Sequence, residues 1–307
     1  MTAGWQQTLR RPALMERSRI MQAIRRYFDG GGFLEVETPL RIPAPAPESH
    51  IDAVPSGDWF LQTSPELCMK RLLASGYERL FQICRCWRDG ERGRLHIPEF
   101  TMLEWYRAGG DYTDLMADCE GLIRSAAACV GKRSFLVVNG AEIALDLPWE
   151  RLSVREAFLR HAGCTMEEAL SADTFDELMV TAIEPHLGME TPTLLCDYPA
   201  KRAALASLKA ADPTVAERFE LYIAGIELAN GFSELTDAVE QKRRFDEEET
   251  FRRSQGRIPY PEPARFLEAL PSMPPSAGIA LGLDRLVMVL LDAASIDAVV
   301  AFTPEEL

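Results

Sequence analysis

The sequence predicts an α+β protein in which an antiparallel sheet is flanked by helices. Three stretches lead to this prediction. Residues 79–88 and 98–107 are two strand-like runs joined by a charged loop with two glycines, the pattern of an antiparallel pair. Residues 218–235 indicate a second strand pair that reverses at Ala224-Gly225. Residues 277–291 indicate a strand of small residues that turns at Gly282 into a helix.

The remaining elements follow from periodicity and turn residues. Apolar residues at helical spacing predict a first helix over 11–29, which Gly30-Gly31-Gly32 would end. Ser64-Pro65-Glu66 has the composition of a helix start, so capping alone could explain these three residues. We further expect strands at 33–38, 59–62 and 193–198, a hairpin over 135–147, and helices at 66–75, 114–130, 173–187, 236–255 and 264–270, with a further helix starting at 153.

Length and composition restrict the class of protein. The 307 residues suffice for one large domain over 1–307, with a helical insertion at about 150–190. A formal net charge of −14 argues against wrapping bulk nucleic acid, although a local basic cleft remains compatible with it. No apolar run has membrane-spanning length, and the N-terminal residues lack the apolar segment of a signal peptide. Seven cysteines at irregular spacings are typical of reduced thiols, so we expect a cytoplasmic protein.

The loop of the first strand pair concentrates positive charge. Such a group of cations needs an anionic partner, and a polyphosphate fits best. Phe100 then offers a ring for a base, and Glu104 and Tyr106 follow it at even spacing on the same face of the strand. The residues of this cationic group are Arg85, Arg88, Arg92, Arg94 and His96.

The second strand pair concentrates negative charge. Glu220 and Glu227 are seven residues apart, and a reversal between them places both on one face of neighbouring strands. Asn230 and Glu234 share a face of the second strand. Carboxylates in an apolar segment need cations, and magnesium or a substrate amine are the candidates. A salt-bridged, exposed strand is the alternative.

The strand-to-helix turn after 277 carries a cation in an unusual place. Gly282 would let a ligand approach the backbone. Arg285 lies in the first helical turn, where a cation opposes the helix dipole, so we expect it to face an anion. The charged helix at 236–255 is expected to be a solvated face, with a patch for a macromolecular partner as the alternative.

Taken together, these stretches resemble the catalytic domain of lysyl-type class II aminoacyl-tRNA synthetases over about residues 11–302. The most specific segments are SPELCMKRLL, HIPEFTMLEWY, RFELYIAGIELANGFSELTDA and ALGLDRLVM. In two features the chain resembles one branch of the family most closely, the ligases that attach β-lysine to elongation factor P. The chain leaves no room for an anticodon-binding domain, and Ala280 stands where lysyl-tRNA synthetases carry glycine.

The resemblance implies roles for individual residues. Arg88 and Arg285 would be catalytic, Phe100 and Arg285 would enclose the adenine, and Glu220 and Glu227 would hold magnesium. The implied ATP-binding residues are Arg88, Asp89, Gly90, His96, Ile97, Phe100, Glu227, Leu228, Gly282 and Arg285. The implied residues for the amino-acid substrate are Ser64, Pro65, Glu66, Glu104, Tyr106, Asn230, Glu234 and Ala280.

The sequence departs from the family pattern at two places in the first hairpin. The usual Phe-Arg-Asn-Glu is replaced by the tetrapeptide at 87–90, which reads WRDG, and a glutamate comes only at Glu91. The usual His-Asn-Pro-Glu reads HIPE at 96–99. The two departures put contacts of Gly90 and Ile97 with ATP in question.

The implied activity is that of a ligase that uses ATP and Mg²⁺. It would adenylate (R)-β-lysine, or lysine, and transfer it to the ε-amine of a specific lysine on elongation factor P. The resemblance also implies a homodimer. One alternative is a lysyl adenylate former, or an enzyme similar to lysyl-tRNA synthetase, with another acceptor. The other is an inactive paralogue that senses lysine or ATP.

Overall fold

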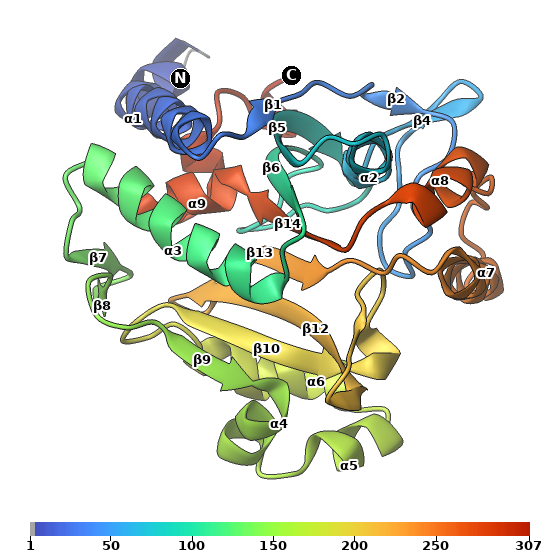
Figure 1. The fold of residues 1–307 in the computed structure, drawn as a ribbon. Helices are drawn as coiled ribbons and strands as arrows, with labels where there is room; N and C mark the ends of the chain where they lie inside the picture. The colour runs from blue at the N-terminus through green and yellow to red at the C-terminus, as the bar shows by residue number, and fades with distance from the viewer. Residues whose placement is uncertain (1–3) are drawn as a thin grey trace.

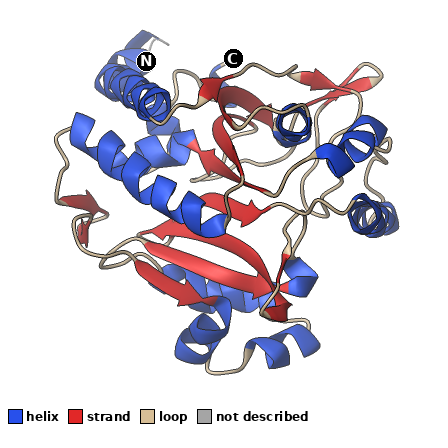
Figure 2. Ribbon diagram, in the orientation of Figure 1, coloured by secondary structure: helices blue, strands red, loops and turns tan. Residues whose placement is uncertain are grey.

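The computed structural model describes residues 4–307, and its framework is one large sheet with helices on both faces (Figure 1, Figure 2). Within residues 4–307, nine strands form this sheet in the order β1-β5-β6-β14-β13-β12-β10-β9, with β11 paired to β12. The inner pairs are antiparallel, as predicted, whereas β1 runs parallel to β5 and β9 parallel to β10. The prediction of an antiparallel sheet is therefore confirmed for the centre and corrected at the two edges.

The elements have the following bounds. The helices are α1 (Gly4–Gly30), α2 (Glu66–Ala74), α3 (Tyr112–Cys129), α4 (Val154–Ala157), α5 (Met166–Ser171), α6 (Phe175–Leu178), α7 (Ala238–Ser254), α8 (Ala264–Ala269) and α9 (Leu283–Leu290). The strands of the large sheet are β1 (Leu34–Glu35), β5 (Arg79–Trp87), β6 (Glu99–Ala108), β9 (Glu150–Ser153), β10 (Thr193–Pro199), β11 (Leu208–Lys209), β12 (Asp212–Ile223), β13 (Ile226–Ser233) and β14 (Ser276–Gly282). Two small sheets contain β2 (Arg41–Ile42), β3 (Pro55–Ser56), β4 (Trp59–Leu61), β7 (Phe135–Val138) and β8 (Ala141–Ala144).

One face of the large sheet is covered by α1, α3 and α9, which lie together on the left of Figure 1. Alternate residues of the central strands, such as Leu103, Trp105 and Ile279, point to this face and are at most 2% exposed. They form one apolar core with residues of these helices. This core fixes the sheet and leaves its opposite face for the site.

The opposite face carries two separate groups of helices. Residues of α2, α7 and α8 form an apolar cluster with Leu80 and Tyr106 at the β5–β6 side of the sheet. The helical segment that follows β9 forms another cluster with Leu195 and Tyr222 at the β10–β12 side. The central strands β6, β14 and β13 lie between the two groups, and their side chains on this face stay available for a site.

Two predicted elements differ from the structure for local reasons. The strand expected at 33–38 is reduced to β1, because Thr38 donates its backbone N–H to the side chain of Gln82 instead of a strand partner. The helix expected at 173–187 is divided into α6, a π-helical turn (Met179–Ile183) and a 3₁₀ turn (Glu184–His186). Pro185 in the last turn lacks the N–H that a continuous helix requires.

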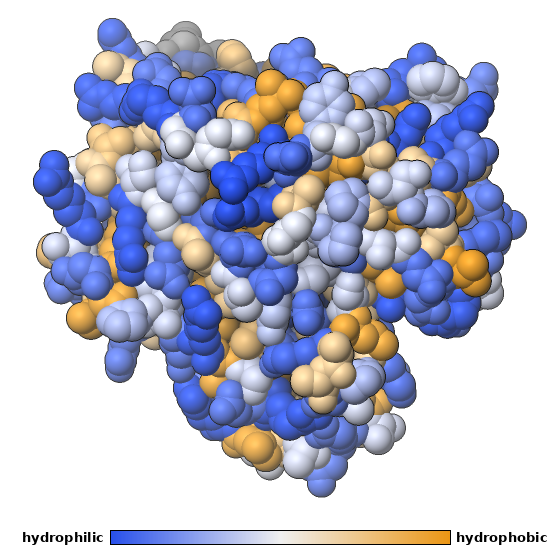
Figure 3. All heavy atoms as spheres, in the orientation of Figure 1, coloured by the Kyte–Doolittle hydropathy of each residue, from blue (hydrophilic) through white to orange (hydrophobic). Residues whose placement is uncertain are grey.

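The second strand pair forms as predicted. Ala224 and Gly225 both have positive φ, at 52° and 70°, which is the conformation of a tight hairpin turn. Hydrophilic residues cover most of the face shown in Figure 3, with apolar side chains in small groups. Within residues 4–307, no helix has both the length and the apolar composition needed to cross a membrane.

Candidate active site

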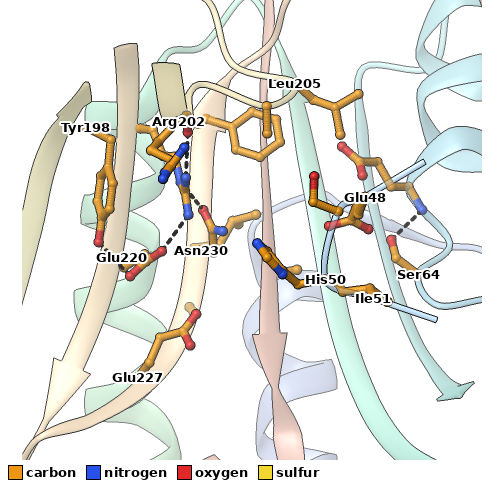
Figure 4. Close-up of a pocket in the computed structure, with 18 of the residues that line it drawn as sticks. Glu48, His50, Ile51, Ser64, Tyr198, Arg202, Leu205, Glu220, Glu227 and Asn230 are labelled. Carbon is orange, nitrogen blue, oxygen red and sulfur yellow. Dashed lines mark hydrogen bonds and ion pairs between the residues drawn. The ribbon is translucent and has the colours of Figure 1, made fainter. Parts of the chain in front are cut away.

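A cavity of about 1080 Å³ lies on the sheet face between the two groups of helices (Figure 4). Its floor is built from β6, β14, β13 and β12. Pairing of these strands with β5 places Gln82, Glu104, Ala280, Asn230 and Glu220 side by side in one row across five strands. Because strands lie about 4.8 Å apart, this row spans about 19 Å, enough for two ligands next to each other.

At one end of the cavity two arginines face an aromatic ring and a carboxylate. The guanidinium of Arg88 lies 5.2 Å from the centre of the Phe100 ring. Arg285 donates to the Glu227 carboxylate at 3.3 Å and contacts His96 Nε2 at 2.5 Å. Burial, and the neighbouring Arg285 charge, lower the pKa of His96, so its ring is neutral and can accept from Arg285. The expectation that Arg285 faces an anion is met here by the Glu227 carboxylate.

Glu220 is held by three donors at the same end. Arg218 donates to one oxygen at 2.6 Å, and the hydroxyls of Tyr198 and Tyr222 donate to the other at 2.6 and 2.7 Å. The nearby charge of Glu220, together with burial as the larger cause, raises the pKa of Glu227. Because the two carboxylates repel each other, they are a fitting place for a divalent cation, which would relieve that repulsion.

A magnesium ion would need ligands besides these side chains. Among residues 4–307, no three His, Cys, Asp or Glu side chains are grouped so that they could hold a metal ion by themselves. Glu227 and Glu220 therefore suit an ion that shares its coordination with the phosphate oxygens of a nucleotide, as Mg²⁺ commonly does.

The other end of the cavity is acidic. Ser64 Oγ donates to Glu104 Oε1 at 2.6 Å and accepts the backbone N–H of Glu66 at 3.0 Å. The Tyr106 hydroxyl donates to Glu104 Oε2 at 2.9 Å. Burial, and next the charge of Glu66, raise the pKa of Glu104 to about 8. The N-cap residue of α2 is Pro65, without a side-chain cap hydrogen bond, so the expected capping by Ser64 is corrected: Ser64 accepts the N–H of Glu66 and orients a cavity carboxylate.

Glu234 is placed differently from the prediction. Its side chain is fully buried just behind the cavity wall, where its Oε2 atom lies 2.5 Å from Nζ of Lys70. Glu66 Oε1 contacts the same ammonium at 2.6 Å. Burial raises the pKa of Glu234 to about 8, against the lowering effect of Lys70. The structure thus gives Glu234 an internal lysine as its partner, and the predicted direct contact of Glu234 with the substrate stays a prediction.

Most predicted site residues line this one cavity. Pro65, Asp89, Gly90 and Glu234 do not. Asp89 and Gly90 are exposed at the hairpin tip, where Gly90 adopts a positive φ of 72° for the turn, so the predicted ATP contacts of these two residues are not supported. The lining residues among those predicted are Ser64, Glu66, Arg88, His96, Ile97, Phe100, Glu104, Tyr106, Glu220, Glu227, Leu228, Asn230, Ala280, Gly282 and Arg285.

The cationic hairpin tip is not a single anion site. Arg92 contacts Asp297 at 2.9 Å and Glu305 at 2.8 Å, which joins the hairpin to the C-terminal segment. Arg94 donates to a backbone carbonyl, and Arg85 turns toward a glutamate of its own hairpin. These three arginines lie outside the cavity, and their charges have partners within the protein.

Sequence reasoning missed several residues of the site. Lys70 and Arg218 are the internal cations of the two ends, and Glu48 comes from a loop that Arg252 holds through the backbone oxygens of Glu48 and Ile51. Lys70 lies four residues after Glu66 on α2, and Arg218 lies two residues before Glu220 on β12. These spacings bring opposite charges together on a helix and on a strand, and were the available signal.

Comparison with known proteins places the chain among characterised sequences. The family described as tRNA synthetases class II (D, K and N) matches residues 5–306. A protein of Enterobacter sp. (strain 638) named elongation factor P–(R)-β-lysine ligase is 40% identical over 320 aligned residues, which cover 98% of each chain. A protein of the same name from Salmonella arizonae has the same identity and coverage.

Proposed function

Because the chain belongs to the class II tRNA synthetases (D, K and N), together with the elongation factor P–(R)-β-lysine ligases, we propose that it is an ATP-dependent ligase for elongation factor P. It activates (R)-β-lysine, or lysine, and transfers the acyl group to a lysine side chain of that protein. One observation carries this proposal. A single cavity has an arginine-rich end next to an aromatic ring and an acidic end on the same sheet face.

The arginine-rich end suits a nucleotide. Phe100 offers a ring for the adenine, and Arg88 must leave that ring to take the α-phosphate. Arg285 exchanges the Glu227 carboxylate for nucleotide groups. Glu227 and Glu220 would hold Mg²⁺, which would offset phosphate charge when bound. The acidic end, with Glu66 and Glu104, suits the amines of a diamino acid.

The reaction then proceeds in two displacements. A carboxylate oxygen of the amino acid attacks the α-phosphorus, a new O–P bond forms, and pyrophosphate leaves. Arg88 stabilises the negative charge that develops on the α-phosphate oxygens. The acceptor amine next attacks the acyl carbon, an amide bond forms, AMP leaves, and the amine loses a proton. No side-chain nucleophile is needed, because positioning and electrostatics supply the rate.

The experiment that tests this proposal has two parts. Pyrophosphate exchange is measured with (R)-β-lysine, (S)-β-lysine and both α-lysine isomers, and elongation factor P is then examined by mass spectrometry after incubation with ATP and each isomer. We expect exchange with at least one lysine isomer and a covalent aminoacyl addition to elongation factor P. Exchange with labelling of tRNA alone would indicate another acceptor, and nucleotide binding without exchange would indicate a sensor. An Arg88→Ala variant serves as the inactive control.

We also propose a homodimer that uses α1 and the adjoining β1. These two elements expose Leu9, Met15 and Leu34, whose side chains are 68%, 55% and 50% accessible. Exposed large apolar side chains favour burial against a partner. Light scattering coupled to size-exclusion chromatography is expected to give twice the mass of one chain, and a monomer at micromolar concentration would contradict this part of the proposal.

A further inference from the structure

Lys70 is a buried cation at the acidic end of the cavity. Its side chain is 1% exposed, and its Nζ atom contacts Glu66 Oε1 at 2.6 Å and Glu234 Oε2 at 2.5 Å. The ammonium also lies 5.0 Å from the centre of the Phe232 ring, a distance at which the ring face attracts a cation. A lysine of α2 thus connects a cavity carboxylate to a carboxylate at the end of β13.

The position of Lys70 favours its charged form. Burial alone would lower its pKa, but Glu234 and Glu66 raise it above the ordinary value. Three other titratable groups lie at this end. Glu104 and Tyr106 of β6 lie near Lys70 and its two carboxylate partners, and Glu48 faces Glu66 from its loop. An uncompensated carboxylate or ammonium would be costly in this buried place, so the groups depend on each other.

Charge counting connects Lys70 to the substrate. Glu66, Glu104 and Glu234 carry three negative charges when ionised, and Lys70 supplies one positive charge from within the protein. Glu48, which faces Glu66, adds a further negative charge when ionised, so Lys70 lowers the excess of negative charge that the two ammonium groups of a diamino acid must balance. Glu66 lines the cavity while one of its oxygens is held by Lys70, which fixes the direction of the carboxylate toward the ligand space.

We propose that Lys70 is the positioning residue of the amino-acid pocket: by binding Glu66 and Glu234, it orients the cavity carboxylate and lowers the negative charge that a substrate with two ammonium groups must balance. This inference rests on the proposed function for the identity of the substrate. Lys70 does not touch the ligand. It acts through Glu66 and through the field that it exerts on Glu104.

The test uses two variants of the full chain. Lys70→Met removes the cation and leaves two buried carboxylates without it, so this variant is also at risk of misfolding. Lys70→Met combined with Glu234→Gln removes both members of the buried pair, and is expected to unfold at a temperature closer to that of the wild type. The double variant keeps Glu66 but lacks the Lys70 ammonium that orients it. A loss of activity in this variant therefore reports the positioning of Glu66 and not the stability of the fold.

Three measurements are made on folded protein: kcat/KM for the amino acid in pyrophosphate exchange, KM for ATP, and the pH dependence of kcat/KM. Both variants are expected to lose about 30- to 100-fold in kcat/KM for the amino acid, the size of a lost charged hydrogen bond. KM for ATP should stay within about 2-fold, since the nucleotide end does not contact Lys70. In Lys70→Met the rise of kcat/KM with pH should shift to higher pH, because Lys70 lowers the pKa of Glu104 in the native protein.

Recovery of wild-type kcat/KM for the amino acid in the double variant would overturn the proposal, since Lys70 would then only neutralise Glu234. A carbon NMR titration of the glutamate carboxyls provides a readout independent of activity. Lys70→Met should raise the pKa values of both Glu234 and Glu104, because Lys70 lowers each of them in the native protein. If the wild type shows no exchange with any lysine isomer, the proposed function fails, and unchanged titrations would separately overturn the role of Lys70.

Discussion

Gly278→Ala is expected to damage the acidic end of the cavity through steric overlap. Gly278 lies in β14 opposite Tyr106 of β6 and Phe232 of β13. A Cβ atom at this position would come closer than 3.0 Å to the Tyr106 ring and to Glu234 Oε1, a separation that real Cβ atoms essentially never show. Tyr106 is 3% exposed and the Glu234 side chain is fully buried, so neither group can turn into solvent.

The expected cost follows from these contacts. Overpacking of a filled site costs about 1–3 kcal/mol. Movement of the Tyr106 ring also weakens the hydrogen bond of its hydroxyl to Glu104, worth about 1.5–3 kcal/mol for a charged acceptor. We therefore expect the free energy of unfolding to fall by roughly 2–5 kcal/mol. Since Glu104 loses its orientation, KM for the amino acid should rise more than 10-fold while KM for ATP changes little.

The assay compares denaturant unfolding and pyrophosphate exchange of Gly278→Ala with those of Gly30→Ala. Gly30 ends α1 and does not have a positive φ, and a Cβ atom added to it would have no other atom within 4 Å. Its substitution is therefore expected to change the free energy of unfolding by less than about 0.5 kcal/mol. If Gly278→Ala behaves like this control in both measurements, the close packing of Tyr106 and Glu234 around Gly278 is wrong.

Three further predictions concern the cavity and its rim. Ala280→Gly enlarges the floor between Glu104 and Asn230, and we expect selectivity to shift toward α-lysine by up to about 10-fold in exchange assays; unchanged isomer selectivity would exclude Ala280 as the discriminator. Because burial raises the pKa values of Glu104 and Glu234 to about 8, a cationic substrate should bind more tightly as pH rises from 6 to 8, and its binding should release protons. Calorimetry in buffers of different ionisation enthalpy measures this proton release, and an affinity that does not depend on pH would contradict the prediction. Arg92→Ala should leave KM for ATP within about 2-fold, since this arginine binds the C-terminal segment. A large increase in KM for ATP would show that Arg92 binds the phosphates.

The sequence was sufficient for the parts of the fold that local chemistry dictates. The two hairpins and the turn from β14 into α9 followed from alternation, turn residues and a glycine, and strand register then placed Glu104, Ala280 and Asn230 in one row. Even spacing along β6 correctly predicted that Phe100, Glu104 and Tyr106 share the cavity face. Local rules suffice here because a pleated strand alternates its side chains without exception unless a bulge intervenes.

Other features could not be predicted because they depend on distant partners. The arginines of the hairpin tip are equivalent in sequence, yet Arg88 enters the cavity while Arg92 meets Asp297 and Glu305 some two hundred residues later. Lys70 lies in an otherwise amphipathic helix, where a lysine is expected to reach solvent. Its burial follows from the position of Glu234, which only the assembled sheet determines.

Three arginines of the cavity share one property that bears on ligand binding: each has a partner within the protein. Arg285 contacts Glu227, Arg218 contacts Glu220, and Arg88 lies on Phe100. A nucleotide or a diamino acid therefore exchanges existing partners instead of meeting bare charges, which makes the desolvation cost of binding smaller. It follows that removing one member of a pair should harm stability more than removing both, and that Arg285, whose partner is the more exposed Glu227, is the first to be released when a nucleotide arrives.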